Sequence, residues 1–171
     1  MKPHVKYGLI AGVASIIWTL IMYLTGVDKS DMANIVNWVA MAVILIFVVL
    51  AVKEQRDMNK GYITFGNAFK TSFLTFLISG VIGCAYYYIH TAMIDPSLIE
   101  YMRDKAMDEM ANKNIPEDQI DIAMKYTNMF LSPGALTAMG FLFNLIIGAI
   151  AGLIVAAIMK KDPPPGEMMI Q

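Results

Sequence analysis

Charge is what this sequence has least of over long stretches. Aspartate, glutamate, lysine and arginine make up 16% of it, below the roughly 25% usual for soluble domains. None of the four residue types occurs in residues 7–25, 32–52, 71–94 or 131–159. Each of these segments is close to or longer than the about 20 apolar residues with which an α-helix crosses a bilayer core. Because the core helices of a soluble protein would each keep a polar face, we predict four membrane-spanning helices.

The sequence has one cysteine and a formal net charge close to zero, and these two features exclude an intramolecular disulfide and give no sign of a nucleic-acid partner. The single cysteine, Cys84, cannot form an intramolecular disulfide and is typical of a small apolar packing residue. The formal net charge is −1 and no stripe of basic and aromatic residues is present, so nothing indicates nucleic acid as a partner. We expect no cofactor and no metal ion, because no group of side chains has the spacing of a known site.

The predicted fold is all-α, a single polytopic membrane domain over residues 1–171 with four transmembrane helices in two hairpins. The spans are expected at about 7–25, 32–52, 69–91 and 134–159. Between spans three and four, residues 95–131 are expected to form an extracytoplasmic amphipathic helical hairpin. The proline-rich end, 162–171, is expected to be disordered. The first span is too long for the about 7–15 apolar residues of a signal peptide and lacks an A-x-A site, so we predict that it is not cleaved.

Small residues recur at helical spacing in the apolar segments, which is typical of helix–helix contacts in lipid. Glycines four positions apart let two backbones approach closely. The amide of Asn144 lies well inside the fourth span and is expected to hydrogen-bond a neighbouring helix. The predicted contact residues are Gly8, Gly12, Ser79, Gly83, Gly140, Asn144, Gly148 and Gly152.

The long polar segment, 91–133, carries eight acidic and four basic residues, a local charge of −4. Its periodicity predicts two amphipathic helices, the first with Asp95 as its cap and Pro96 at its first position. Both apolar faces are expected to pack on each other and on the span ends, because an anionic lipid surface repels the segment. The predicted partner-surface residues are Glu100, Asp104, Asp108, Met102 and Met124.

The three carboxylates of that surface could instead hold a divalent cation. They lie along one helix face, where they repel one another, and a hard cation would relieve the repulsion. However, Arg103 and Lys105 are their neighbours, and the spacing is not that of an EF-hand loop. The pattern therefore favours a solvated charged face.

Lysine and arginine are distributed unevenly around the predicted spans. One side holds Lys2, Lys6, Lys53, Arg56, Lys60, Lys70, Lys160 and Lys161. The other side holds Lys29 and the bases of the acidic segment. By the positive-inside rule, both termini are expected in the cytoplasm of a bacterium, and the acidic segment outside its inner membrane.

Several motifs resemble one bacterial membrane family. They are R-x4-G-Y-I-T-F-G-x-A-F at 56–69, I-D-P-S-L-I-E at 94–100, I-P-E-D-Q-I-D-I-A-M at 115–124 and S-P-G at 132–134. The pattern covers nearly the whole chain and is similar to the family catalogued as domain of unknown function 4199. The resemblance implies a four-span inner-membrane protein, and it implies no activity and no functional residues.

We predict a noncatalytic membrane protein, a structural or partner-binding component. Its expected partners are the lipid bilayer and either a second copy of the chain or another membrane protein. The alternative is a small oligomeric channel or transporter, although a coupled carrier usually keeps ionisable residues at mid-membrane depth. A third interpretation is a membrane enzyme acting on lipid, because His90-x4-Asp95 is similar to the H-x4-D of glycerolipid acyltransferases. Spacing alone is a weak signal for that chemistry.

Overall fold

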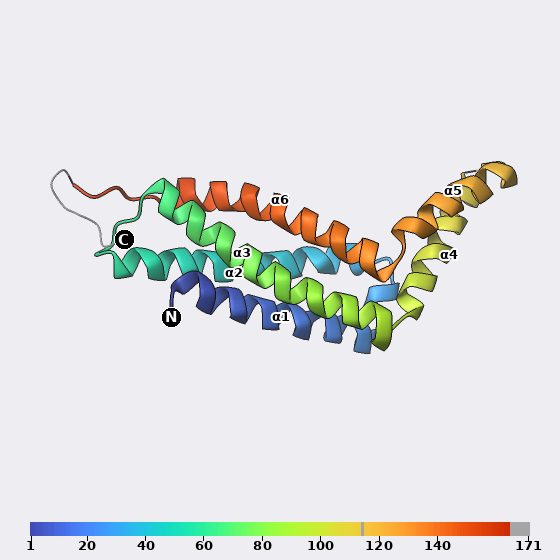
Figure 1. Ribbon diagram of the computed structural model, residues 1–171, viewed down its shortest axis with the longest axis horizontal. Coiled ribbons are helices and arrows are strands. Elements are labelled where there is room, and N and C mark those ends of the chain that lie inside the picture. Colours follow the sequence, from blue (N-terminus) through green and yellow to red (C-terminus); the bar gives the residue numbers. More distant parts are fainter. Residues whose placement is uncertain (114, 165–171) are drawn as a thin grey trace.

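The computed structural model describes residues 1–113 and 115–164, and within them it contains helices and no strand (Figure 1). In chain order the elements are α1 (Pro3–Thr25), the 3₁₀ turn η1 (Val27–Lys29), α2 (Ala33–Met58), α3 (Phe65–Ile89), the π-helical turn η2 (His90–Ile94), α4 (Ser97–Asn112), α5 (Glu117–Phe130) and α6 (Pro133–Met159). Of the end for which the sequence predicts disorder, residues 165–171 lie outside the described residues.

Helices α1, α2, α3 and α6 lie side by side as a bundle in which α3 contacts the other three (Figure 1). In the described part of the chain, the helices long and apolar enough to cross a membrane are Pro3–Thr25, Ile35–Met58, Phe65–Ile94 and Pro133–Met159. Their length and composition indicate an integral membrane protein. The predicted all-α fold with four spans is confirmed. The N-terminus and the end of α6 mark the terminal end of the bundle, and η1 and η2 mark the hairpin end (Figure 1).

Local sequence signals explain where two of the spans begin or end. Gly26 follows α1 in the left-handed region, with φ of 70°, and its N–H donates to two carbonyls of the last turn. Ser132 caps α6, since its Oγ accepts a hydrogen bond of 3.3 Å from the Ala135 N–H. Pro133 occupies the first turn of α6, where its missing N–H costs nothing.

The apolar core is small and lies toward the terminal end. Its buried members are Val48, Val52, Ile63, Ala68, Phe76, Val155 and Ala156. An isolated antiparallel bridge closes this end, because Ile63 and Lys161 exchange backbone hydrogen bonds of 2.9 and 2.8 Å. Many large apolar side chains of the spans point outward, which is stable only where lipid replaces water around them.

Small residues bring α1 and α3 into close contact. A Cβ atom placed on Gly8 or Gly12 of α1 would lie 2.8 Å from the Cβ of an α3 isoleucine. A Cβ atom placed on Gly83 of α3 would lie 2.9 Å from the Oγ of Ser15. These three glycines therefore set the distance between the two helices.

The contact between α3 and α6 is built in the same way. A Cβ atom on Gly148 would lie 2.8 Å from the Cβ of Phe76, and one on Gly152 would lie 3.4 Å from the Phe69 ring. Ser79 is buried on α3, where its Oγ donates to the Phe76 carbonyl at 3.0 Å. Gly148 and Gly152 therefore allow the backbone of α6 to lie close to α3.

Helices α4 and α5 pack on each other and project from the hairpin end of the bundle (Figure 1). Only the first turn of α4 is buried, at Leu98 and Ile99. The expectation that both helices dock their apolar faces on the bundle is therefore wrong for most of the hairpin.

Helix α5 carries two apolar faces, and only one of them is covered. Its partly buried residues, Met124 among them, lie on one side, and α5 contacts α4. Ile122, Tyr126, Met129 and Phe130, which we call the outer face of α5, are 54–67% exposed. At 3.6 residues per turn these four share one side of the helix, opposite Met124.

Candidate functional site

The hairpin end of the bundle holds a cavity of about 330 Å³, a volume within the range of small-molecule sites. Residues of α1, α2, α3 and α4 and of the turns η1 and η2 form its wall. Aromatic and charged side chains meet there, including Trp18, Asp28, Tyr87, His90, Tyr101 and Lys105. Mixed apolar and polar walls of this kind can bind and orient a ligand.

Asp28 is the most unusual group of the cavity wall. It lies in η1, directly after the chain turns at Gly26. Both of its carboxylate oxygens are buried, and neither has a hydrogen-bond donor among the described residues. The indole N–H of Trp18 is likewise buried without an acceptor in that part of the chain. Burying polar groups without partners costs free energy, so this pair of groups requires an explanation.

Lys29, the next residue, is engaged elsewhere. Its Nζ lies 2.9 Å from Asp95 Oδ2 and donates to Ser97 Oγ at 2.9 Å. The hydrogen bond with Asp95 raises the pKa of Lys29. Burial alone would raise the pKa of the Asp95 carboxyl, but hydrogen bonds from Ser97 and Lys29 outweigh burial and lower it. This ion pair joins η1 to the start of α4.

The prediction that Asp95 caps α4 is wrong. No side-chain cap hydrogen bond is found at this helix start, and α4 begins at Ser97, after Pro96. Asp95 is only 4% exposed, and its carboxylate accepts hydrogen bonds from Lys29 and from the Ser97 hydroxyl instead. Its role in the fold is to neutralise a cation between two elements.

His90 and Asp95 are not arranged as a catalytic pair. The His90 side chain is 1% exposed, and its Nδ1 lies 3.3 Å from the Tyr86 hydroxyl. Its ring packs edge-on against Tyr23, with 5.2 Å between ring centroids. The two residues meet through the backbone, where the Asp95 N–H donates to the His90 carbonyl at 2.7 Å. The side-chain geometry therefore gives no support to the acyltransferase interpretation.

A second ion pair holds α4 near η1. Lys105 Nζ lies 2.8 Å from Asp31 Oδ1, although the Asp31 side chain is 94% exposed. The hydrogen bond between them lowers the pKa of Asp31 and raises that of Lys105. Lys29, the neighbour of Asp28 in the sequence, and Lys105 of the cavity wall are thus paired with carboxylates other than Asp28.

The predicted partner-surface residues separate into two groups. Glu100, Asp104 and Asp108 are exposed on α4, whereas Met102 faces the cavity and Met124 is partly buried. Within the described ranges, no three His, Cys, Asp or Glu side chains form a group that could hold a metal ion. The acidic face therefore has the features of a solvated surface.

Two predicted contact residues of α6 differ from expectation. Nothing lies within 4 Å of a Cβ placed on Gly140, which instead borders a crevice of about 350 Å³ with Ser79 and Cys84. Asn144 packs against Gly80, but its Oδ1 is buried and accepts no hydrogen bond in the part of the chain that the structure describes. Gly140 is thus not a close helix contact, and the hydrogen bond expected between the Asn144 amide and a neighbouring helix is not found among the described residues.

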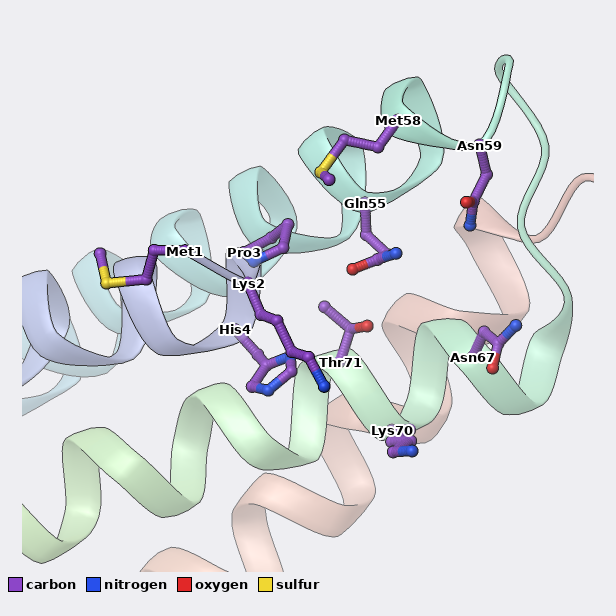
Figure 2. Close-up of a pocket in the computed structure, with 10 residues that line it drawn as sticks. All are labelled: Met1, Lys2, Pro3, His4, Gln55, Met58, Asn59, Asn67, Lys70 and Thr71. Atoms are coloured by element: carbon purple, nitrogen blue, oxygen red, sulfur yellow. The ribbon is translucent and has the colours of Figure 1, made fainter. Parts of the chain in front are cut away.

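A further pocket of about 660 Å³ lies at the terminal end (Figure 2). The start of α1, the end of α2 and the start of α3 surround it. Lys2 and Lys70 give it a basic character, and no carboxylate of the described residues lines it. These side chains can attract an anion. However, membrane proteins generally carry more lysines on one side of the membrane, so the lysines alone do not indicate an anion-binding site.

Sequence reasoning missed the cavity and its main groups, Asp28 and Trp18. Asp28 stands in a short turn between spans, where aspartate is common for local reasons. Its burial depends on α4, whose residue Tyr101 is far away in the chain. Trp18 lies in an uncharged span and gives no local sign of an unpaired N–H.

Comparisons with known proteins extend only to the family level. A family model described as a protein of unknown function (DUF4199) matches residues 6–161. No curated protein matches this chain, and no solved structure matches it.

Proposed function

The match over residues 6–161 shows that the chain belongs to the DUF4199 family, and from that premise we propose that it is a noncatalytic membrane protein that binds a second copy of itself. The outer face of α5 is the observation that carries this proposal. It is a strip of large apolar side chains on a hairpin that projects beyond the spans (Figure 1). A strip of this kind outside the membrane is typical of an interaction surface.

The negative charge of the hairpin favours a protein, and not a lipid surface, as the partner that covers the outer face of α5. The segment 91–133 has a net charge of −4, and anionic lipids repel such a segment. Helices that lie on membranes usually carry lysine and arginine beside their apolar face, whereas α5 has one lysine and several acids. Repulsion between two hairpins acts only at short range, because ions screen exposed charges over about 8 Å at physiological ionic strength.

Symmetry favours a second copy as that protein. Membrane insertion holds all copies in one plane and one orientation, and a twofold axis is the commonest symmetry of small assemblies. With both copies in one orientation the two hairpins point the same way, so pairing of their outer faces would set Tyr126 against Tyr126 and Phe130 against Phe130 (Figure 1). Large apolar and aromatic groups would then cover one another.

The orientation of the assembly is part of the proposal. The excess of lysine and arginine at the terminal end supports cytoplasmic termini in a bacterial inner membrane, with the hairpin outside. A noncatalytic role is supported by the partners of His90 and Asp95, because the His90 ring lies against the Tyr86 hydroxyl and the Asp95 carboxylate pairs with Lys29.

Cysteine cross-linking in membranes tests the interface. In a Cys84→Ala background, Tyr126→Cys should give a disulfide-linked dimer on mild oxidation, because two copies meet at this position. Met124→Cys is the matched control on the opposite side of α5, and it should remain monomeric.

Other outcomes would overturn the proposal. A Tyr126→Cys adduct whose mass is not twice that of the chain would show that a different protein covers the outer face. A Tyr126→Cys chain that stays monomeric while a probe at this position is quenched by brominated lipid would show that lipid covers it.

A further inference from the structure

We propose that the cavity at the hairpin end binds a small organic ammonium ion, with the Asp28 carboxylate as its counter-charge. This proposal is independent of dimerisation. It rests on the cavity, on a buried carboxylate without a donor and on the aromatic walls around it.

The Asp28 carboxylate needs a cation that the described residues do not supply. Its two oxygens are buried at the wall of a cavity large enough for a small molecule. The neighbouring cations are engaged, since Lys29 pairs with Asp95 at 2.9 Å and Lys105 with Asp31 at 2.8 Å. A ligand ammonium group would bring both the charge and the N–H donors that the oxygens lack.

The other walls fit the rest of such a ligand. Trp18, Tyr87 and Tyr101 line the cavity, and aromatic faces attract organic cations. The Trp18 indole N–H is a buried donor without an acceptor among the described residues, so it suits a ligand with a hydroxyl or carbonyl oxygen near its ammonium group. The site therefore selects a short amine that carries a hydrogen-bond acceptor.

The same walls disfavour a metal ion. Calcium takes about six to eight oxygen ligands, usually from several carboxylates, and magnesium demands near-octahedral oxygen ligands. Asp28 is the one carboxylate that lines the cavity in the described part of the chain. A single carboxylate does not supply such a ligand set.

Tryptophan fluorescence gives a direct test, because the chain has two tryptophans. In a Trp38→Phe variant the remaining Trp18 reports on the cavity. Ethanolamine, which is protonated at neutral pH, should change the Trp18 emission saturably. Ethylene glycol has a similar shape and no charge, and it should not.

Two substitutions complete the experiment. Asp28→Asn should weaken ethanolamine binding at least about tenfold, because a charge-assisted hydrogen bond is lost. It should leave the thermal midpoint unchanged or raised, since the carboxylate has no partner among the described residues. Asp104→Asn, on the exposed face of α4, is the control and should bind as the parent protein does.

Three results would overturn the proposal. The first is an absence of saturable change with ethanolamine. The second is equal binding by the parent protein and Asp28→Asn. The third is a response to calcium chloride that depends on Asp28 and competes with ethanolamine, which would make the site a metal site.

Discussion

Lys29 joins the η1 turn to α4 through a carboxylate that is almost fully buried. Lys29→Met should lower the free energy of unfolding by roughly 1.5–3 kcal/mol, because the Asp95 carboxylate would stay buried without its charged donor. Chemical denaturation in detergent measures this. Lys6→Met is the matched control, since Lys6 pairs with Glu54 at 2.7 Å and this carboxylate is 30% exposed, against 5% for that of Asp95, so water can solvate it when the lysine is removed. An equal loss in both variants would contradict the special role of the buried pair.

The pH dependence of unfolding provides a second readout of the same pair. The pKa of Asp95 is lowered in the folded protein, so its stabilising contribution is present above its usual pKa of about 3.9 and is lost as pH falls through the folded value. The pKa of Lys29 is raised, so its contribution is present below its usual pKa of about 10.4 and is lost as pH rises through the folded value. Lys29→Met should weaken both changes.

Individual residues were the hardest level to predict from the sequence. Asp95 beside Pro96 has the pattern of a helix start, yet its carboxylate pairs with Lys29, which stands 66 positions earlier. Asp28 has the pattern of a turn residue, yet both of its oxygens are buried. A long-range partner or a distant covering helix decides each case, and neither leaves a local trace.

At the scale of whole elements, the contact between α3 and α6 depends on close backbone approach. Gly148→Leu should lower the free energy of unfolding by about 1–3 kcal/mol or more, because its Cβ would lie 2.8 Å from that of Phe76. Thermal unfolding in detergent measures the change. Ile147→Leu, one position earlier, conserves volume and should cost less. Equal midpoints for the two variants would show that α6 does not pack through this face.

The spans could be predicted because each is a long stretch without charge, a property of the local sequence alone. Helix periodicity also predicted α4 and α5. It could not show which apolar face of α5 is covered, because Met124 and Tyr126 lie on opposite sides of one helix and both are apolar. The contact partner of a face depends on the path of the chain between helices.

At the scale of the whole molecule, the two ends of the bundle differ in charge and in the sites that they hold. The terminal end carries most of the lysines and arginines and a basic pocket. The hairpin end carries the acidic segment and the Asp28 cavity. The orientation in the membrane therefore decides which compartment could supply a ligand to each site.

Thiol labelling in intact cells tests this orientation. In a Cys84→Ala background, Lys113→Cys should react with an impermeant thiol reagent, because the positive-inside rule predicts that the hairpin lies outside the cytoplasm. Asp57→Cys, near the end of α2, should react only after lysis. Both positions are exposed, so access to the compartment and not burial decides the outcome. If Asp57→Cys reacts in intact cells and Lys113→Cys does not, the orientation is inverted. The Asp28 cavity would then face the cytoplasm, and any ammonium ligand would have to come from inside the cell.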